Sequence, residues 1–246
     1  MRRYGPAVIL LLCGAAILRI ALFSNLYLRY VQPALHPYLI TSGALLSFLG
    51  LLRAAQVTLD RRRRNEPGGG HSHDEEQGRA HAHGSRAAWL LAVPALLLLL
   101  SPPPALGSYS ADREEAQRTA QGVGTFPALP HGNPVDLTLG AFTSRAIYDS
   151  GRSLKGRTIR MTGFVTRGKG DTWYLTRLFV TCCAADATAY KTEIRGAQAP
   201  APDTWVSVTG VWHPKGSLGS AQAWPPVLDA DSVKRVKEPQ DPYEKR

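Results

Sequence analysis

Two stretches in the second half of the chain decide its fold. Residues 154–167 read LKGRTIRMTGFVTR, and residues 176–188 read TRLFVTCCAADAT. Both are rich in β-branched and aromatic residues, which favour strands. Similar stretches follow, separated by the turn-forming sequences GKGD, GAQAPAPD and HPKGSLG. This pattern predicts five strands, at residues 158–167, 172–183, 187–195, 204–212 and 227–236.

Five short strands with such turns predict a mostly-β domain over residues 157–237, with the architecture of an OB-like five-stranded barrel. A five-stranded sandwich is the alternative. The connector at residues 107–156 is rich in Gly and Pro, and we expect helices in it at residues 111–120 and 139–150. Residues 238–246 are expected to form a tail.

The first part of the chain has a different composition, because long leucine-rich runs dominate residues 1–106. Segments 6–23, 38–56 and 87–106 each approach the ~20 residues that cross a bilayer as a helix. The first segment lacks a small-residue cleavage pattern, so we expect a retained helix in place of a signal peptide. The sequence therefore predicts a membrane region of three transmembrane helices, with a flexible Arg/His-rich loop at residues 57–86.

The charge distribution indicates the orientation in the membrane. The net charge is +10, but 11 basic and only 5 acidic residues lie in the first 106 residues, around the apolar runs. Arg2, Arg3 and the basic run at residues 61–64 place the N-terminus and the second loop in the cytoplasm by the positive-inside rule. Three crossings then place the β domain outside the cytoplasm. We expect a multi-pass plasma-membrane protein that contacts the lipid bilayer and binds no nucleic acid.

Four histidines occur within thirteen residues of the second loop, as two His-x-His pairs with acidic residues between them. Imidazole and carboxylate groups suit zinc and other divalent ions of the first transition series. The hypothesis is a zinc-binding loop on the cytoplasmic side, and the alternative is a passive linker. Its ligands would be His71, His73, His81 and His83.

The chain has three cysteines, of which Cys13 lies in an apolar run and is expected to pack there. Cys182 and Cys183 are adjacent, and on a strand their side chains would point to opposite faces. They could bind a metal together with Asp186 and His213, form a labile redox pair, or simply pack. The sequence leaves these three possibilities open.

Common catalytic motifs are missing from the sequence. It has no phosphate-binding Walker loop, no Gly-x-Ser-x-Gly elbow, no His-Glu-x-x-His and no paired acid and base. The tryptophans of the β domain could stack nucleobases, but packing is the simpler interpretation for a domain outside the cytoplasm. We therefore expect a protein that is not an enzyme.

Several stretches resemble the YcgQ-like family of bacterial membrane proteins, which are described as permease subunits. They are YVQPALHPYLITSGALLSFLGL, LLLLLSPPPALGS, LKGRTIRMTGFVTR, YLTRLFVTCCAADA, DTWVSVTGVW and PPVLDADSVKRV. The most specific part is the Thr-Arg-x-x-x-x-Cys-Cys-x-Ala-Asp-Ala string. By this similarity, the family positions in this chain are Gly163, Arg177, Cys182, Cys183 and Asp186.

The resemblance implies a role beside a larger polytopic permease, which is typically encoded nearby. The resulting expectation is an accessory membrane subunit of a permease complex, linked to the handling of zinc or another divalent metal. Two alternatives belong to other classes: a membrane-anchored binding module that acts outside the cytoplasm, and a thiol-redox protein that acts through Cys182 and Cys183.

Overall fold

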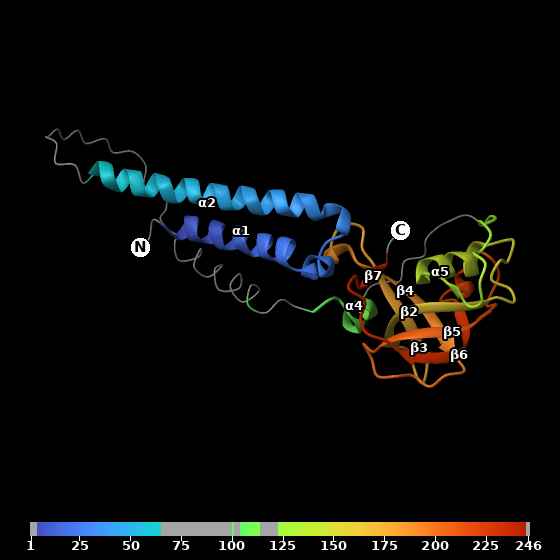
Figure 1. The fold of residues 1–246 in the computed structure, drawn as a ribbon. Coiled ribbons are helices and arrows are strands. Elements are labelled where there is room, and N and C mark those ends of the chain that lie inside the picture. Colours follow the sequence, from blue (N-terminus) through green and yellow to red (C-terminus); the bar gives the residue numbers. More distant parts are fainter. Residues whose placement is uncertain (1–3, 65–99, 101–103, 114–122, 245–246) are drawn as a thin grey trace. The chain divides into compact units, whose positions relative to one another are not determined.

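The computed structural model describes residues 4–64, 100, 104–113 and 123–244. The chain divides into two compact units (Figure 1). The first comprises Met1–Tyr27 and Pro33–Pro104, and the second comprises Leu28–Gln32 and Ala105–Arg246. The short segment between the first two long helices therefore belongs to the same unit as the C-terminal domain, although more than seventy residues of sequence separate it from Ala105.

The first unit contains α1 (Gly5–Phe23) and α2 (His36–Arg64), with the short η2 turn (Pro33–Leu35) before α2. Both helices are long and apolar enough to cross a membrane, with mean hydropathy of 2.4 and 1.5 over the candidate spans. They match the first two expected spans, except that α2 continues eight residues past the expected end. The third expected span, residues 87–106, lies almost wholly outside the described residues and stays a prediction.

Small residues let α1 and α2 approach each other closely. A Cβ atom on Gly14 would come within 2.8 Å of the backbone nitrogen of Ser47, and one on Gly50 would come within 2.8 Å of Leu11. Such contacts are typical of helix pairs in membranes, where tight van der Waals packing replaces the hydrophobic effect as the source of association. At the loop end of the pair, the His36 ring stacks on Tyr27 with the ring centroids 4.5 Å apart.

The second unit is mostly β. Each of the five expected strands has a counterpart, and the helix expected at residues 139–150 is α5. The helix expected at 111–120 begins earlier, as α4, and residues 114–120 lie outside the described part. The elements are η1 (Asn25–Arg29, at the boundary of the two units), α4 (Ser108–Arg113), β1 (Val135–Asp136), α5 (Leu139–Tyr148), β2 (Thr158–Arg167), β3 (Trp173–Phe179), η3 (Ala184–Asp186), β4 (Thr188–Arg195), β5 (Trp205–His213), η4 (Ala221–Ala223), β6 (Val227–Arg235) and β7 (Tyr243–Glu244).

The strand pairings return to their starting point. The sheet has the order β1-β2-β5-β6-β4-β3-β7, and β2 also pairs with β3. The five predicted strands therefore form a closed cycle in which each has two neighbours. The β4–β6 pair is parallel, and the other four pairs of the cycle are antiparallel. The two short strands lie outside the cycle: β1 is parallel to β2, and β7 is parallel to β3.

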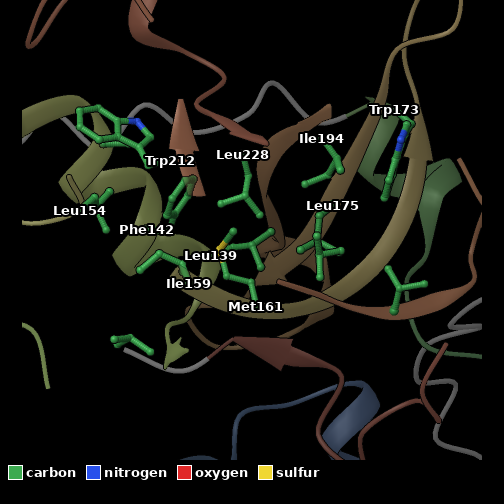
Figure 2. Close-up of a cluster of buried hydrophobic side chains, with 14 of the residues drawn as sticks. Leu139, Phe142, Leu154, Ile159, Met161, Trp173, Leu175, Ile194, Trp212 and Leu228 are labelled. Atoms are coloured by element: carbon green, nitrogen blue, oxygen red, sulfur yellow. The ribbon is translucent and has the colours of Figure 1, made fainter. Parts of the chain in front are cut away.

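The core lies between this cycle of strands and α5. Along β5 every second residue is buried, as the period of a strand with one face inward requires. From α5, Leu139, Phe142 and Ala146 face the same cluster at helical spacing. Figure 2 shows the cluster, with Leu175, Ile194 and Leu228 of the strands among its labelled members.

Gly163 of β2 lies close to the backbone of β3. A Cβ atom at this position would lie 2.5 Å from the carbonyl oxygen of Thr176, a distance that no side chain tolerates. The glycine therefore permits a backbone contact that a larger residue would push apart.

Candidate functional site

A tight loop follows β3 and carries the two adjacent cysteines. We call residues 181–186 the twin-cysteine loop. The Asp186 carboxylate closes it by accepting hydrogen bonds from the backbone N–H groups of Thr181 at 3.0 Å and Cys182 at 2.8 Å. Aspartate often stabilises turns in this way. These bonds draw the chain out of the sheet, so β3 ends at Phe179 and does not continue through the cysteines as expected.

The loop changes the environment of the two thiols. On a strand they would face opposite sides, but here their Sγ atoms are 3.6 Å apart, and neither sulfur is in a disulfide. Cys182 is exposed and Cys183 is half-buried, so neither enters the core. Hydrogen bonding to Asp186, and then to Cys183, raises the pKa of Cys182 to about 11. Its thiol is therefore protonated at neutral pH, whereas nucleophiles and metal ligands act as thiolates.

The Asp186 carboxyl responds in the opposite direction. Partial burial acts to raise its pKa, but hydrogen bonds from the Cys182 side chain and from three backbone N–H groups outweigh it, so the pKa lies below its ordinary value. The carboxylate is therefore ionised at neutral pH, and this is the form that accepts the hydrogen bonds of the loop.

The short segment that connects α1 to α2 in the sequence, and that belongs to the second unit, binds directly to this loop. We call residues 29–32 the docked segment. Val31 forms an antiparallel bridge with Cys183, with bonds from Gln32 N–H to the Cys182 carbonyl at 3.1 Å and from Ala184 N–H to the Tyr30 carbonyl at 2.8 Å. The Gln32 side-chain amide also donates to the carbonyl of Val180. All of these groups lie within the second compact unit, and they extend its hydrogen bonding by one short strand.

The C-terminal strand binds the other end of the docked segment. The Tyr243 hydroxyl donates to the Arg29 carbonyl at 2.7 Å, although 214 positions separate the two residues. Tyr243 is only 4 % exposed, and burial raises the pKa of its hydroxyl. The hydroxyl therefore stays protonated over the physiological range and keeps its role as a donor.

Arg177 holds β7 and β2 together through main-chain carbonyls. Its guanidinium donates to the carbonyls of Asp241 at 3.0 Å, Tyr243 at 3.3 Å and Thr162 at 3.4 Å, and it lies over the Trp205 ring. Its Nε is buried and has no hydrogen-bond partner within the described part of the chain. Burial lowers the pKa of the guanidinium, while the nearby carboxylates of Glu244 and Asp241 act in the opposite direction. Arginine nevertheless remains charged in proteins.

Glu244 places a carboxylate at the beginning of α5. It is 7 % exposed and accepts from the backbone N–H of Leu139 at 2.5 Å and of Gly140 at 2.7 Å. Carboxylates satisfy the free N–H groups of a helix start and interact favourably with its dipole. Burial raises the pKa of Glu244, although these hydrogen bonds and Arg177 partly oppose the effect.

A cavity of about 470 Å³ lies beside these anchors. It is lined by two guanidinium groups and three carboxyl groups, with Leu137, Thr138, Thr162 and Tyr243 between them. Two of these charged groups form an ion pair, since Arg160 donates to both carboxylate oxygens of Asp136. The volume suits a small ligand, and the mixed charges favour a polar one. The charged residues are Asp136, Arg160, Arg177, Asp241 and Glu244.

His213 lies far from the twin-cysteine loop. Its ring bonds to Asp229 at 2.9 Å and to Arg195 at 3.2 Å. Arg195 is the last residue of β4, whose first residue Thr188 pairs with Phe179 beside the loop. A strand of this length spans roughly 24 Å. The structure therefore brings Cys182, Cys183 and Asp186 together, and it does not bring His213 to them.

The described residues contain no cluster of three or more His, Cys, Asp and Glu side chains arranged to hold a metal ion. The loop histidines His71, His73, His81 and His83 lie outside the described residues. Sequence reasoning did not identify the docked segment, Glu244 or the cavity. A buried carboxylate two residues from the end of a Pro-containing tail gives no periodic signal that could have identified it.

Comparison with known protein families gives a match in the C-terminal part of the chain. Residues 141–244 match the sequence model described as the DUF1980 C-terminal domain. The match begins within α5, includes every strand from β2 to β7, and contains Gly163, Arg177 and the twin-cysteine loop. It supports a relationship to the DUF1980 family. Among curated proteins, none matches the chain.

The bonds made by Asp186 lead to a prediction for Asp186→Asn. The amide has one acceptor oxygen in place of two, so one backbone N–H loses its partner, and we expect the β domain to lose about 1 kcal/mol of unfolding free energy at neutral pH. Denaturant unfolding in detergent, followed by tryptophan fluorescence, measures this change. Asp171→Asn, at an exposed carboxylate in the turn before β3, is a control for general loss of a surface carboxylate.

The same substitution has a defined pH dependence. The pKa of Asp186 is lower in the folded protein than in the unfolded chain, so its contribution is fully present above its ordinary value of 3.8. The contribution is lost as the pH falls through the lower folded-state value. The difference between wild type and variant should therefore shrink below about pH 4. A difference that grows on acidification would contradict the assignment.

Proposed function

We propose that the chain is a membrane-anchored accessory subunit of a larger permease, with its β domain outside the cytoplasm. One observation supports this most directly: the docked segment, which connects α1 to α2, is hydrogen-bonded into the β domain. A segment that shares a compact unit with the domain must share its compartment. The domain is therefore proposed to lie on the side of the membrane where α1 ends and α2 begins.

The charge pattern assigns that side. Arg2, Arg3 and the basic residues 61–64 flank the opposite ends of α1 and α2, which the positive-inside rule places in the cytoplasm. The docked segment then lies outside. For residues 104–244 to return to that side, the chain must cross again after α2, and the apolar residues 87–106 supply the only remaining long leucine-rich run. This argument favours three spans.

We also propose that the cycle of strands is an OB-like barrel. Numbered along the chain, the five strands of the cycle occur in the order first, second, third, fifth and fourth, with the third and fifth parallel. This is the connectivity of the OB fold, a five-stranded Greek-key barrel. Such barrels commonly carry binding surfaces on their strands and loops, which suits an accessory subunit.

The roles of the motif residues support a binding subunit over an enzyme. Arg177 and Asp186 donate to or accept from the chain's own backbone, and Gly163 permits strand contact. The raised pKa of Cys182 disfavours it as the rapid nucleophile that a thiol-redox enzyme needs. The alternative of an anchored binding module rests on the cavity beside Arg177, which could take a small polar ligand.

The permease assignment itself comes from the resemblance to YcgQ-like proteins, with which the DUF1980 match at residues 141–244 is consistent. In this proposal the apolar helices pack against the permease within the bilayer. The exposed leucines and phenylalanines of α1 and α2, such as Leu22, Phe23 and Phe48, provide apolar surface for lipid or for a partner helix.

The topology predicts the behaviour of C-terminal reporter fusions. Alkaline phosphatase fused after Arg246 should be active, because it folds only outside the cytoplasm, whereas green fluorescent protein at the same position should be dark when exported by the general secretory route. Fusions after residue 64 should show the reverse pattern. Fluorescence from the C-terminal fusion in the cytoplasm would overturn the proposed topology.

The proposed partnership predicts co-purification. A tagged copy extracted in mild detergent should retain the polytopic membrane protein encoded by the neighbouring gene, detected through a second tag. An unrelated multi-span protein carrying the same second tag serves as the control. Recovery of the neighbour at the control level, with the bait intact, would favour the stand-alone binding module.

Zinc binding by the histidine loop is a separate part of the proposal. Purified protein should bind zinc near-stoichiometrically, because two His-x-His pairs can converge on one ion. Alanine at His71, His73, His81 and His83 should remove most of this binding in isothermal titration. His213→Ala, whose ring bonds to Asp229 and Arg195, serves as the matched control. Equal binding by the fourfold variant would show that the loop is a passive linker.

A further inference from the structure

Only the backbone groups of Cys182 and Cys183 bind the docked segment, whereas the Cys182 thiol bonds within its own loop, to Asp186 and Cys183. Their sulfurs are 3.6 Å apart, both are free, and Cys182 is exposed to solvent. We propose that Cys182 and Cys183 are a site of reversible thiol oxidation, at which a disulfide between them releases the docked segment from the β domain. The extracytoplasmic location proposed above matters here only as the source of the oxidant.

Closure of this disulfide must distort the peptide group between the two cysteines. The sulfurs have to approach from 3.6 Å to the ~2.05 Å of a disulfide bond. Disulfides usually join residues whose Cα atoms are ~4.4–6.8 Å apart, but neighbours across a trans peptide are only ~3.8 Å apart. The ring that forms also contains the linking peptide bond, so its closure strains the planar trans geometry and twists or reorients that peptide.

Both the carbonyl and the N–H of that peptide group are hydrogen-bonded. Its carbonyl belongs to Cys182 and accepts from the Gln32 N–H at 3.1 Å, while its N–H belongs to Cys183 and donates to the Asp186 carboxylate. The next residue, Ala184, donates to the Tyr30 carbonyl at 2.8 Å. Rotation of the peptide breaks the Gln32 bond directly and weakens the bridge between Val31 and Cys183.

The coupling acts in both directions, as linkage requires. The docked segment holds the peptide in the geometry that suits two free thiols, so docking favours the reduced form. Release of the segment removes this restraint and favours the oxidised form. A strained, exposed disulfide is also readily reduced, which makes the modification reversible.

The chemical step balances with a disulfide-bearing oxidant, either a small molecule or an oxidoreductase. One cysteine, as its thiolate, attacks a sulfur of the oxidant and displaces the other sulfur as a thiolate, which gives a mixed disulfide. The second cysteine loses its proton and displaces the remaining oxidant sulfur. The protein loses two hydrogen atoms, that is, two protons and two electrons, and the oxidant becomes two thiols.

The test uses the full chain in detergent with Cys13→Ala, so that only the two thiols of interest remain. Oxidised glutathione is the oxidant. Intact mass spectrometry should show the loss of two hydrogen atoms, reversed by dithiothreitol. Hydrogen–deuterium exchange should then show faster exchange at Gln32 and Ala184, by about tenfold, the protection that one hydrogen bond supplies.

Matched variants separate this effect from general damage. Cys182→Ser and Cys183→Ser keep the size of the side chains but cannot close the ring, so glutathione should leave exchange at Gln32 unchanged. Amides within β5 and β6 should be insensitive to oxidation in every variant. An accumulated mixed disulfide without ring closure, thiols that stay free, or ring closure with unchanged exchange at Gln32 would each overturn the proposal. Because none of these outcomes involves a permease, they are independent of the co-purification result.

Discussion

The second unit depends on satisfying the backbone hydrogen-bonding groups of one loop. When the chain leaves β3, the N–H and carbonyl groups of residues 181–184 lose their partners in the sheet and must find others. The Asp186 carboxylate accepts hydrogen bonds from the N–H groups of Thr181 and Cys182. The docked segment bonds to the Cys182 carbonyl and to the Ala184 N–H. One loop thus links three parts of the sequence: the connection between α1 and α2, the end of β3 and the start of β4.

Two charged side chains, the half-buried Arg177 and the buried Glu244, extend this arrangement to the C-terminal strand. β7 contributes only two residues to the sheet, too few to be stable through strand pairing alone. Arg177 binds the carbonyls around it, and Glu244 binds the start of α5. Each side chain is therefore hydrogen-bonded to backbone groups, as the burial of polar groups requires. The cavity beside them is a consequence, because two charged groups held apart by their backbone partners cannot pack as tightly as apolar side chains.

The sequence predicts the parts of this structure that have a local signal. The alternation along residues 204–212 and the β-branched residues of 158–167 give β5 and β2 almost to the residue, and the apolar runs give α1 and α2. Among the candidate site residues, Cys182, Cys183 and Asp186 were identified from the sequence itself, and Arg177 was identified through the family resemblance.

Other features have no such signal. Residues 181–183 of the twin-cysteine loop were expected to be strand. They leave the sheet because Asp186 binds their backbone N–H groups, a competition that only the folded turn shows. The docked segment and Glu244 act through contacts between distant parts of the chain, which no periodicity encodes. The bond made by Gln32 spans 148 positions, the bond made by Tyr243 spans 214, and the bond from Leu139 to Glu244 spans 105. The placement of His213 away from the cysteines follows from strand register, which the sequence of one strand does not specify.

The position of the docked segment along the chain affects the order of folding. Residues 29–32 are synthesised before almost every group they bind, and their partners at Val180, Cys182 and Tyr243 are added last. Contacts of such long sequence separation form slowly, because a large loop must close, at a cost in conformational entropy, before any hydrogen bond can stabilise it. During biogenesis the segment between α1 and α2 must therefore wait for these partners until the final strand has been synthesised.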